Sequence, residues 1–166
     1  GLTDFVDPME PSLVRALIAQ ELLHDDERFE DIFAEFDDEP LGAASVAQVH
    51  RAVLTEAYGG RTVAVKVQRP AIEAKLLGDV AALKGLAKAI RGLEAVPVDY
   101  YTVFSELEAQ LADEFDFINE AAAMERIGNV LSVDADGTPC TPVLVTPRPV
   151  GGLVTRRVLV MDFLPG

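Results

Sequence analysis

The stretch Thr62-Val63-Ala64-Val65-Lys66-Val67-Gln68 decides the fold, because it has the pattern of one β-strand with two unlike faces. Successive side chains of a strand point to opposite faces, so the three valines share one face and Ala64, Lys66 and Gln68 share the other. An ammonium group is costly to bury without an anionic partner. Lys66 therefore lies either at an exposed edge of a sheet or beside a carboxylate from another element.

A second extended run precedes this strand. Residues 41–54, with the sequence LGAASVAQVHRAVL, are small or β-branched at most positions, and Gly59-Gly60 follows them. Two extended runs joined across a glycine pair are typical of a β-hairpin. We therefore predict two antiparallel strands on either side of this turn.

Helical patterns flank the hairpin on both sides. Apolar residues at spacings of three and four predict helices over residues 11–22, 70–93 and 99–130, and a short helix carrying Phe29, Ile32, Phe33 and Phe36. Two short strands are predicted near residues 142–146 and 156–162. This order of elements predicts an α+β fold in which helices cover one side of an antiparallel sheet.

Composition narrows the classes of function. The 166 residues include 14 basic and 28 acidic side chains, a net charge of −14, and 49% are hydrophobic. A packed core is therefore expected, and a general nucleic-acid-binding role is excluded because such a surface repels polyanions. Cys140 is the single cysteine, which excludes an internal disulfide and a cysteine-based zinc cluster. No apolar run approaches the roughly 18 residues that a membrane-spanning helix needs.

The motif Val63-Ala64-Val65-Lys66 is similar to the strand-three lysine motif of protein kinases, whose lysine binds phosphates and pairs with a helix glutamate. Kinases also carry a G-x-G-x-x-G-x-V loop one hairpin earlier. Residues 42–49, GAASVAQV, keep the first glycine and the final valine of that loop but have Ala44 and Ala47 at the other two glycine positions. Alanine permits close backbone approach but loses the positive φ of glycine, so we expect this alanine loop (residues 42–47) to be stiffer and to control nucleotide selectivity.

Together, LGAASVAQVHRA and VAVKVQRP resemble the UbiB/AarF (ADCK-type) family of atypical kinase-like proteins, which carries an alanine-rich loop. Residues 114–121, EFDFINEA, are similar to the E-x-D helix of the family, with Glu114 and Asp116 as its acidic pair. Residues 157–163 are similar to the strand and hinge that join the two kinase lobes. The resemblance covers roughly residues 10–166 and implies a protein-kinase-like N-lobe over residues 40–166, with an antiparallel sheet, a long αC-type helix and additional family-specific helices. Residues 1–39 would form an N-terminal helical extension.

The resemblance also implies a site for ATP or ADP with Mg²⁺. Lys66 and Glu120 would be its catalytic residues, Lys66 orienting the phosphates and Glu120 holding Lys66, while Val49 and Ala64 would pack on adenine and the hinge would offer backbone groups. The metal ligands would come from the missing C-lobe. The full set of implied nucleotide-binding residues is Gly42, Ala43, Ala44, Ser45, Val46, Ala47, Val49, Ala64, Lys66, Met161, Asp162 and Phe163.

Three family motifs are expected outside the sequence. The Lys-x-Gly-Gln motif should lie upstream, and the catalytic loop and metal-binding Asp-Phe-Gly should lie downstream. Asp162-Phe163-Leu164 has leucine where that glycine belongs, so we assign it to the hinge. We therefore expect an N-lobe that is catalytically inactive by itself. Two other interpretations remain open at this point, a pseudokinase module that binds nucleotide without turnover and a helical adaptor that binds none.

The partners implied by the resemblance are quinone-biosynthesis proteins or a membrane surface, engaged through the missing parts of the protein. The implied locations are the bacterial cytoplasm or inner-membrane face, the mitochondrion and the plastid. Nothing in the residues themselves chooses among these locations.

Helical geometry gives an independent expectation for Glu120. On one continuous helix at 100° per residue, Asp113, Asp116 and Glu120 fall within about 60° of one another, and Phe117 and Met124 flank them. We therefore predict a partly buried Glu120 that pairs with Lys66, and a Glu114 that points elsewhere. His50 follows the loop and is expected to pack or hydrogen-bond rather than to catalyse, since no second histidine or thiolate stands at metal-ligand spacing.

Overall fold

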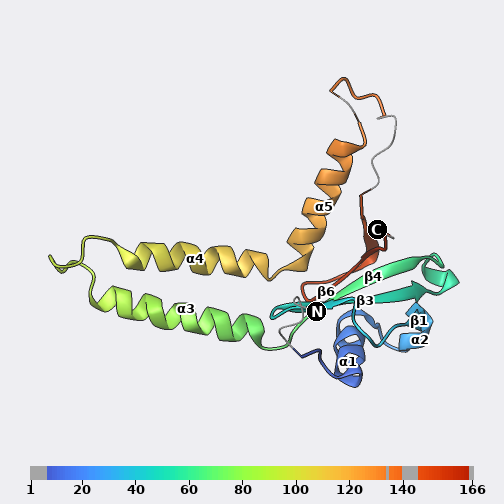
Figure 1. The fold of residues 1–166 in the computed structure, drawn as a ribbon, viewed down its shortest axis with the longest axis horizontal. Helices are drawn as coiled ribbons and strands as arrows, with labels where there is room; N and C mark the ends of the chain where they lie inside the picture. Colours follow the sequence, from blue (N-terminus) through green and yellow to red (C-terminus); the bar gives the residue numbers. More distant parts are fainter. Residues whose placement is uncertain (1–6, 134, 140–145, 165–166) are drawn as a thin grey trace. The chain divides into compact units, whose positions relative to one another are not determined.

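The computed structural model describes residues 7–133, 135–139 and 146–164. Cys140 and the strand predicted at 142–146 lie outside these residues, apart from Thr146. The chain divides into two compact units, residues 1–69 with 117–166 and residues 70–116. The predicted boundary at residue 39 is not a boundary between these two units. We call them the sheet unit and the helical unit (Figure 1).

The sheet unit is built on an antiparallel sheet, as predicted. The order of strands across the sheet is β1 (Phe33–Phe36), β3 (Ala47–Leu54), β4 (Thr62–Gln68), β6 (Val158–Asp162) and β5 (Pro149–Val154), and the short β2 (Gly42–Ala43) also pairs with β3. In Figure 1 the hairpin of β3 and β4 lies next to β6. The turn between β3 and β4 contains a 3-10 helix (Glu56–Tyr58) and ends at Gly59-Gly60, whose positive φ angles of 104° and 66° favour glycine. The predicted hairpin is confirmed.

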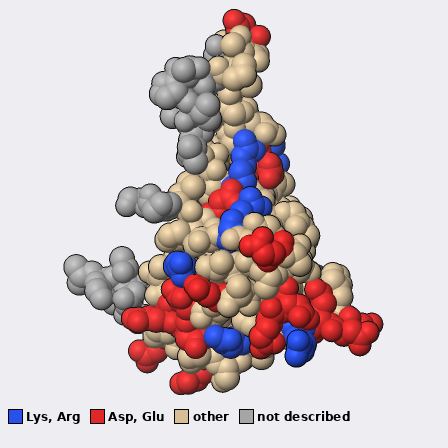
Figure 2. Space-filling model, turned by 90° about the vertical axis from the view of Figure 1, so that its right-hand side faces the viewer, with Lys and Arg blue, Asp and Glu red and all other residues tan. Residues whose placement is uncertain are grey.

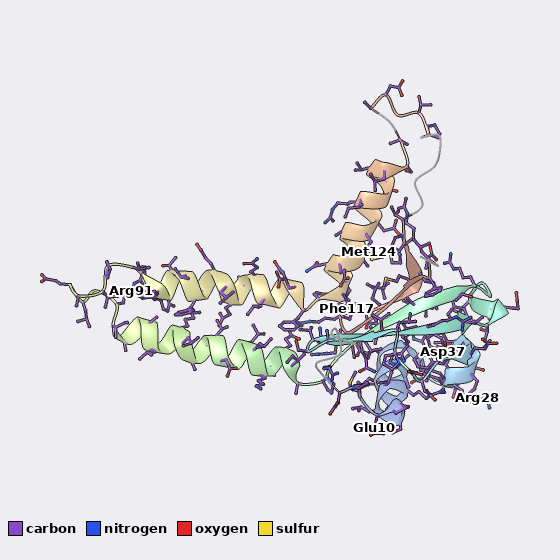
Figure 3. All side chains as sticks on the ribbon, viewed as in Figure 1. Glu10, Arg28, Asp37, Arg91, Phe117 and Met124 are labelled. Atoms are coloured by element: carbon purple, nitrogen blue, oxygen red, sulfur yellow. The ribbon has the colours of Figure 1, made fainter. Side chains whose placement is uncertain are left out.

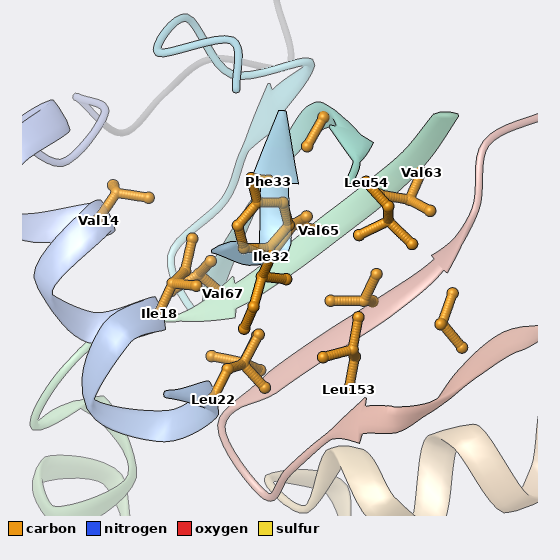
Figure 4. Close-up of a cluster of buried hydrophobic side chains, with 14 of the residues drawn as sticks. Val14, Ile18, Leu22, Ile32, Phe33, Leu54, Val63, Val65, Val67 and Leu153 are labelled. Atoms are coloured by element: carbon orange, nitrogen blue, oxygen red, sulfur yellow. The ribbon is translucent and has the colours of Figure 1, made fainter. Parts of the chain in front are cut away.

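One face of β4 lies in the main core. Val63, Val65 and Val67 are fully buried, and helix α1 (Pro11–Leu22) packs across them with Val14 and Ile18. Figure 4 shows these side chains between α1 and the sheet. Because α1 covers this face, the valine face of the strand is closed to ligands.

The segment predicted as a short helix through Phe36 changes structure halfway. Helix α2 (Phe29–Ile32) lasts one turn, and the chain then enters β1, which pairs with β3. The rings of Phe29, Phe33 and Phe36 still gather, with centroids 4.9 to 5.7 Å apart. The apolar spacing therefore reflects a real cluster, but pairing with β3 outweighs helix formation.

The single long helix predicted over residues 99–130 is wrong. The chain forms α4 (Tyr100–Glu114) and α5 (Phe117–Leu131), separated by Phe115 and Asp116. The N–H of Phe117 donates to the carbonyl of Arg156 at 3.0 Å, instead of to a carbonyl one turn earlier in a continuous helix. Asp113 and Asp116 therefore belong to the helical unit and Glu120 to the sheet unit, and the three residues do not share one continuous helix.

The helical unit is a pair of helices that pack side by side. Helix α3 (Ile72–Ala89) is shorter than predicted at both ends, and it packs against α4. Lys84 of α3 donates to Glu108 of α4 at 3.2 Å. No helix in the described part of the chain is both long enough and apolar enough to cross a membrane.

Candidate nucleotide site on the sheet

The second face of β4 brings together most of the apolar residues predicted to meet a base. Val49 of β3 and Leu159 of β6 both lie opposite Lys66, and Met161 lies opposite Ala64. Paired residues of an antiparallel sheet share a face, so these five side chains form one surface. Leu159 was not predicted as part of it, although aligning the hinge strand with β4 would have placed it there.

Lys66 makes the predicted ion pair with Glu120. Its Nζ donates to the two carboxylate oxygens of Glu120 at 2.9 and 3.2 Å, and it lies 5.1 Å from the ring centroid of Phe117. The side chains are 27% and 38% exposed, so solvent reaches the pair. An ion pair this exposed contributes at most about 1 kcal/mol to stability, which leaves the ammonium group available to an anionic ligand.

Helix α5 is held against this face by a small apolar cluster. The buried residues are Ala47, Phe117, Ala121 and Leu159, and the half-buried Met124 packs on them. Figure 3 shows Phe117 at the start of α5 and Met124 further along it. Together with the Phe117–Arg156 hydrogen bond, this packing fixes the helix end that carries Glu120.

Arg148 holds the other half of α5, which the sequence did not reveal. Its Nη1 donates to the carbonyl and Oε2 of Glu125, at 3.2 and 2.9 Å, and to Oδ1 of Asn129 at 3.1 Å. The guanidinium crosses Gly128 so closely that a Cβ there would overlap its Cζ. The carbonyl of Arg148 accepts the N–H of Asp162 at 2.9 Å, so one residue connects α5 with the hinge strand.

The two alanines of the alanine loop are not equivalent. Ala47 is buried in the cluster under α5, whereas Ala44 and Ser45 are exposed. Asp26 and Ala71 are the residues other than glycine with positive φ in the described part of the chain, so neither loop alanine needs a glycine conformation. The N–H of Ala44 donates to the carbonyl of Ala47 at 2.9 Å and closes a tight turn.

The hinge segment has two of its N–H groups already engaged. Asp162 donates to Arg148, and Phe163 donates to the carbonyl of Thr62 at 3.4 Å. A base that approaches Met161, Asp162 and Phe163 would therefore need other backbone groups of this segment. These two N–H groups are therefore not open to the edge of a base, whereas the apolar surface on which the base would pack does not involve them.

His50 lies on the closed face of the sheet, in a buried hydrogen-bonded row. Its Nδ1 contacts the carbonyl of Asp37 at 2.8 Å, its Nε2 contacts Nε2 of Gln48 at 2.8 Å, and the N–H of Met9 donates to Oε1 of Gln48 at 2.9 Å. An imidazole protonated on Nδ1 alone satisfies every contact. Burial lowers the pKa of His50. The prediction that His50 packs and hydrogen-bonds is confirmed.

The acidic pair of the E-x-D motif lies at the end of the helical unit. Glu114 is the last residue of α4 and is exposed, while Asp116 is half-buried. Across residues 7–133, 135–139 and 146–164, no group of three or more His, Cys, Asp or Glu side chains could hold a metal ion.

Acidic side chains dominate much of the surface. Residues 25–39 include nine acidic side chains and one basic, Arg28. Figure 2 shows acidic side chains gathered over the lower part of one face. An anionic ligand must therefore find a local cation, and Lys66 supplies one beside the alanine loop.

Comparison with known proteins also identifies kinase-like relatives. All 166 residues match the family model of the ABC1 atypical kinase-like domain. The chain is 37% identical over 153 residues to AarF domain-containing protein kinase 1 of Mus musculus, covering 92% of this chain and 26% of the relative. It is 35% identical over 167 residues to the probable protein kinase UbiB of Azotobacter vinelandii, covering 99% of this chain and 29% of the relative.

A solved structure is also similar. Rv3197 of Mycobacterium tuberculosis, determined in complex with erythromycin, superposes with a TM-score of 0.74 at 26% identity, covering 99% of this chain and 38% of that one. The chain therefore spans between about a quarter and two fifths of the length of these relatives. The expected α+β, kinase-like N-lobe fold is confirmed.

Proposed function

Because the chain belongs to the ABC1 atypical kinase-like domain family, we propose that it is the ATP-binding N-lobe of an atypical kinase or ATPase that supports isoprenoid-quinone or lipid metabolism. The observation that carries the proposal is the ion pair of Lys66 and Glu120 on a face that also presents Val49 and Ala64. Membership of the family would allow many activities, but this pairing is what a lobe needs to orient phosphates.

Each part of this face has a distinct role in the proposal. Val49, Ala64 and Met161 provide an apolar surface for adenine, and Lys66 binds the phosphates while Glu120 fixes its ammonium group. The alanine loop covers the phosphates from the turn between β2 and β3. Magnesium, held by residues of the C-lobe, would neutralise phosphate charge, so we expect this chain alone to bind nucleotide weakly and to turn over none.

A second candidate function is a pseudokinase module that binds nucleotide without turnover. The closed turn from Ala44 to Ala47 favours it, because this turn reduces the backbone freedom that catalysis at a flexible loop requires. Phosphate release by the full-length protein distinguishes the two functions, since the module would bind ATP and release none.

The test compares Lys66→Ala with Lys84→Ala in the full-length protein. Lys84 is a close match: it pairs with Glu108 at 3.2 Å, contacts the ring of Tyr101 at 5.5 Å, and is 28% exposed, against 27% for Lys66. We expect Lys66→Ala to weaken ATP and ADP binding by tenfold or more, because it removes a charged contact to phosphate. Lys84→Ala should bind like the parent protein.

The measurement is calorimetric titration of ATP and ADP with magnesium, with thermal unfolding of each variant as the folding control. Equal binding by the parent and Lys66→Ala proteins would contradict the site. A parent protein that binds neither nucleotide would contradict nucleotide binding altogether and favour the helical adaptor.

A further inference from the structure

Arg69 binds backbone carbonyls of three residues and has no place in the site described above. It directly follows β4. Its N–H donates to the carbonyl of Val46, its Nε to the carbonyl of Ala44, and its Nη2 to the carbonyl of Asp7, each at 2.8 Å. Two of these acceptors lie in the alanine loop and the third lies in the segment before α1.

These contacts fix the orientation of peptide groups in the loop. In a trans peptide the C=O and the N–H of the following residue point in opposite directions. When the carbonyl of Ala44 faces Arg69, the N–H of Ser45 therefore faces away from the guanidinium. The hydrogen bond from Ala44 N–H to the carbonyl of Ala47 holds the same turn from its other side.

Arg69 and Lys66 lie on opposite sides of the sheet. Alternation places Arg69 on the side of Val67, and its contact with Asp7 agrees, because Met9 two residues later is buried in the main core with Val67. Lys66 contacts Phe117 and Glu120 of α5 on the other side. The Ser45 N–H therefore points away from the guanidinium, and Lys66 lies on the side of the sheet that the guanidinium does not occupy.

We propose that Arg69 is a positioning residue that holds the alanine loop in its closed turn and presents the Ser45 N–H to a phosphate group beside Lys66. The inference rests on the proposed nucleotide site and adds a determinant of its geometry. In an ordinary glycine loop the backbone itself moves to reach the phosphates. Here the arginine fixes the loop from behind, before any ligand arrives.

Arg69 also connects the loop with the segment before α1. The same guanidinium that binds Ala44 binds Asp7, and the N–H of Met9 donates to Gln48 at the start of β3. Separate nitrogens of one rigid, planar guanidinium bind these two carbonyls, and the compact ammonium group of a lysine does not reproduce that geometry. Displacing residues 7–9 should therefore loosen the loop.

The experiment uses Arg69→Lys in the full-length protein, with Arg157→Lys as the matched control. Arg157 lies at the same end of the sheet, and its Nη1 donates to the side chain of Gln68 at 2.9 Å. Hydrogen exchange over residues 41–49 reports the loop, and titration with ATP and ADP plus magnesium reports the site. Thermal unfolding shows whether each variant folds.

We expect Arg69→Lys to fold, to exchange faster over residues 41–49, and to bind ATP about tenfold more weakly with a changed ratio of ATP to ADP affinity. Arg157→Lys should change neither quantity. Faster exchange with unchanged nucleotide binding, or unchanged exchange, overturns the inference.

The experiment gives different results if the proposed function fails than if only the inference about Arg69 fails. If the parent protein binds neither nucleotide, the site and the phosphate role of Ser45 fall together, whatever Arg69→Lys does. If the parent binds and Lys66→Ala does not, the site stands, and the Arg69 variants alone decide the inference.

Discussion

The two faces of β4 differ in polarity and in the helix that covers them, although they alternate residue by residue. Val63, Val65 and Val67 are fully buried against α1, whereas Lys66 on the other face is 27% exposed and pairs with a carboxylate. The closed face is held by burial of apolar surface, which is the dominant source of stability. The open face is held by a small cluster under α5 and by polar contacts, so its geometry can change at little cost to folding.

The largest effect on stability should come from a substitution in the core that covers the closed face. Ile18→Ala removes a fully buried side chain of α1, and we expect the free energy of unfolding to fall by about 2 to 5 kcal/mol. Leu13→Ala on the same helix is the control, because Leu13 is exposed and its loss should change stability by about 0.5 kcal/mol or less. Chemical denaturation of both variants measures the difference, and similar losses would mean that α1 is not the cover of this face.

A smaller effect on the free energy of unfolding is expected at Gly128 of α5, the helix that packs on the open face. Replacing a helical glycine by alanine normally stabilises a helix by up to about 1 kcal/mol, and Gly85→Ala should do so because nothing lies within 4 Å of its Cβ position. At Gly128 the new Cβ displaces Arg148, whose hydrogen bonds to Glu125 and Asn129 are then lost. We expect the two variants to differ by about 1 to 2 kcal/mol in unfolding free energy.

A double variant sharpens this result. If the loss at Gly128→Ala comes from displacing Arg148, then adding Arg148→Ala should cause little further loss, since both changes remove the same contacts. Additive losses would show instead that Gly128 is needed for another reason.

The sequence predicted the regions whose pattern is local. The hairpin of β3 and β4, helix α1 and the pair of Lys66 and Glu120 follow from alternation, helical spacing and the family motifs. The break after α4 did not follow, because Phe115-Asp116-Phe117 contains no glycine or proline, and the break depends on a hydrogen bond to Arg156 far along the chain. Arg69 and Arg148 were missed for the same reason, since their acceptors are backbone carbonyls and distant side chains that leave no local pattern.

His50 is the polar exception on the closed face and predicts a dependence on pH. Burial is the largest cause that lowers its pKa, against the opposing effects of the hydrogen bond to Asp37 and the charges of Asp37 and Asp38. The unfolded chain therefore binds a proton near pH 6.5, where the folded protein does not. The stability that His50 contributes is present above pH 6.5 and is lost as the pH falls through the folded pKa.

The measurement is the unfolding midpoint between pH 7.5 and pH 5. As the pH is lowered past about 6.5, we expect the unfolding midpoint of the parent protein to decrease. The midpoint of His50→Gln should be lower at pH 7.5 but should change less with pH, because glutamine does not titrate. A parallel fall in both proteins would assign the effect to other groups.

The smallest change in stability, and the sharpest test of the open face, is Ala44→Gly. Ala44 is exposed, so the substitution removes no buried contact and should lower the free energy of unfolding by about 0.4 to 1 kcal/mol, chiefly through the unfolded chain. If the loop controls nucleotide selectivity, the full-length variant should change its relative affinity for ATP and ADP, or release phosphoryl transfer, by more than this folding change explains.

Ala47→Gly is the contrast, because Ala47 fills space under α5 and its loss should act mainly on stability. Thermal unfolding and both nucleotide affinities, measured on the same samples, separate the two effects. An unchanged ratio of affinities in Ala44→Gly would mean that the exposed alanine is neutral and that the loop is set by Arg69 and Ala47 alone.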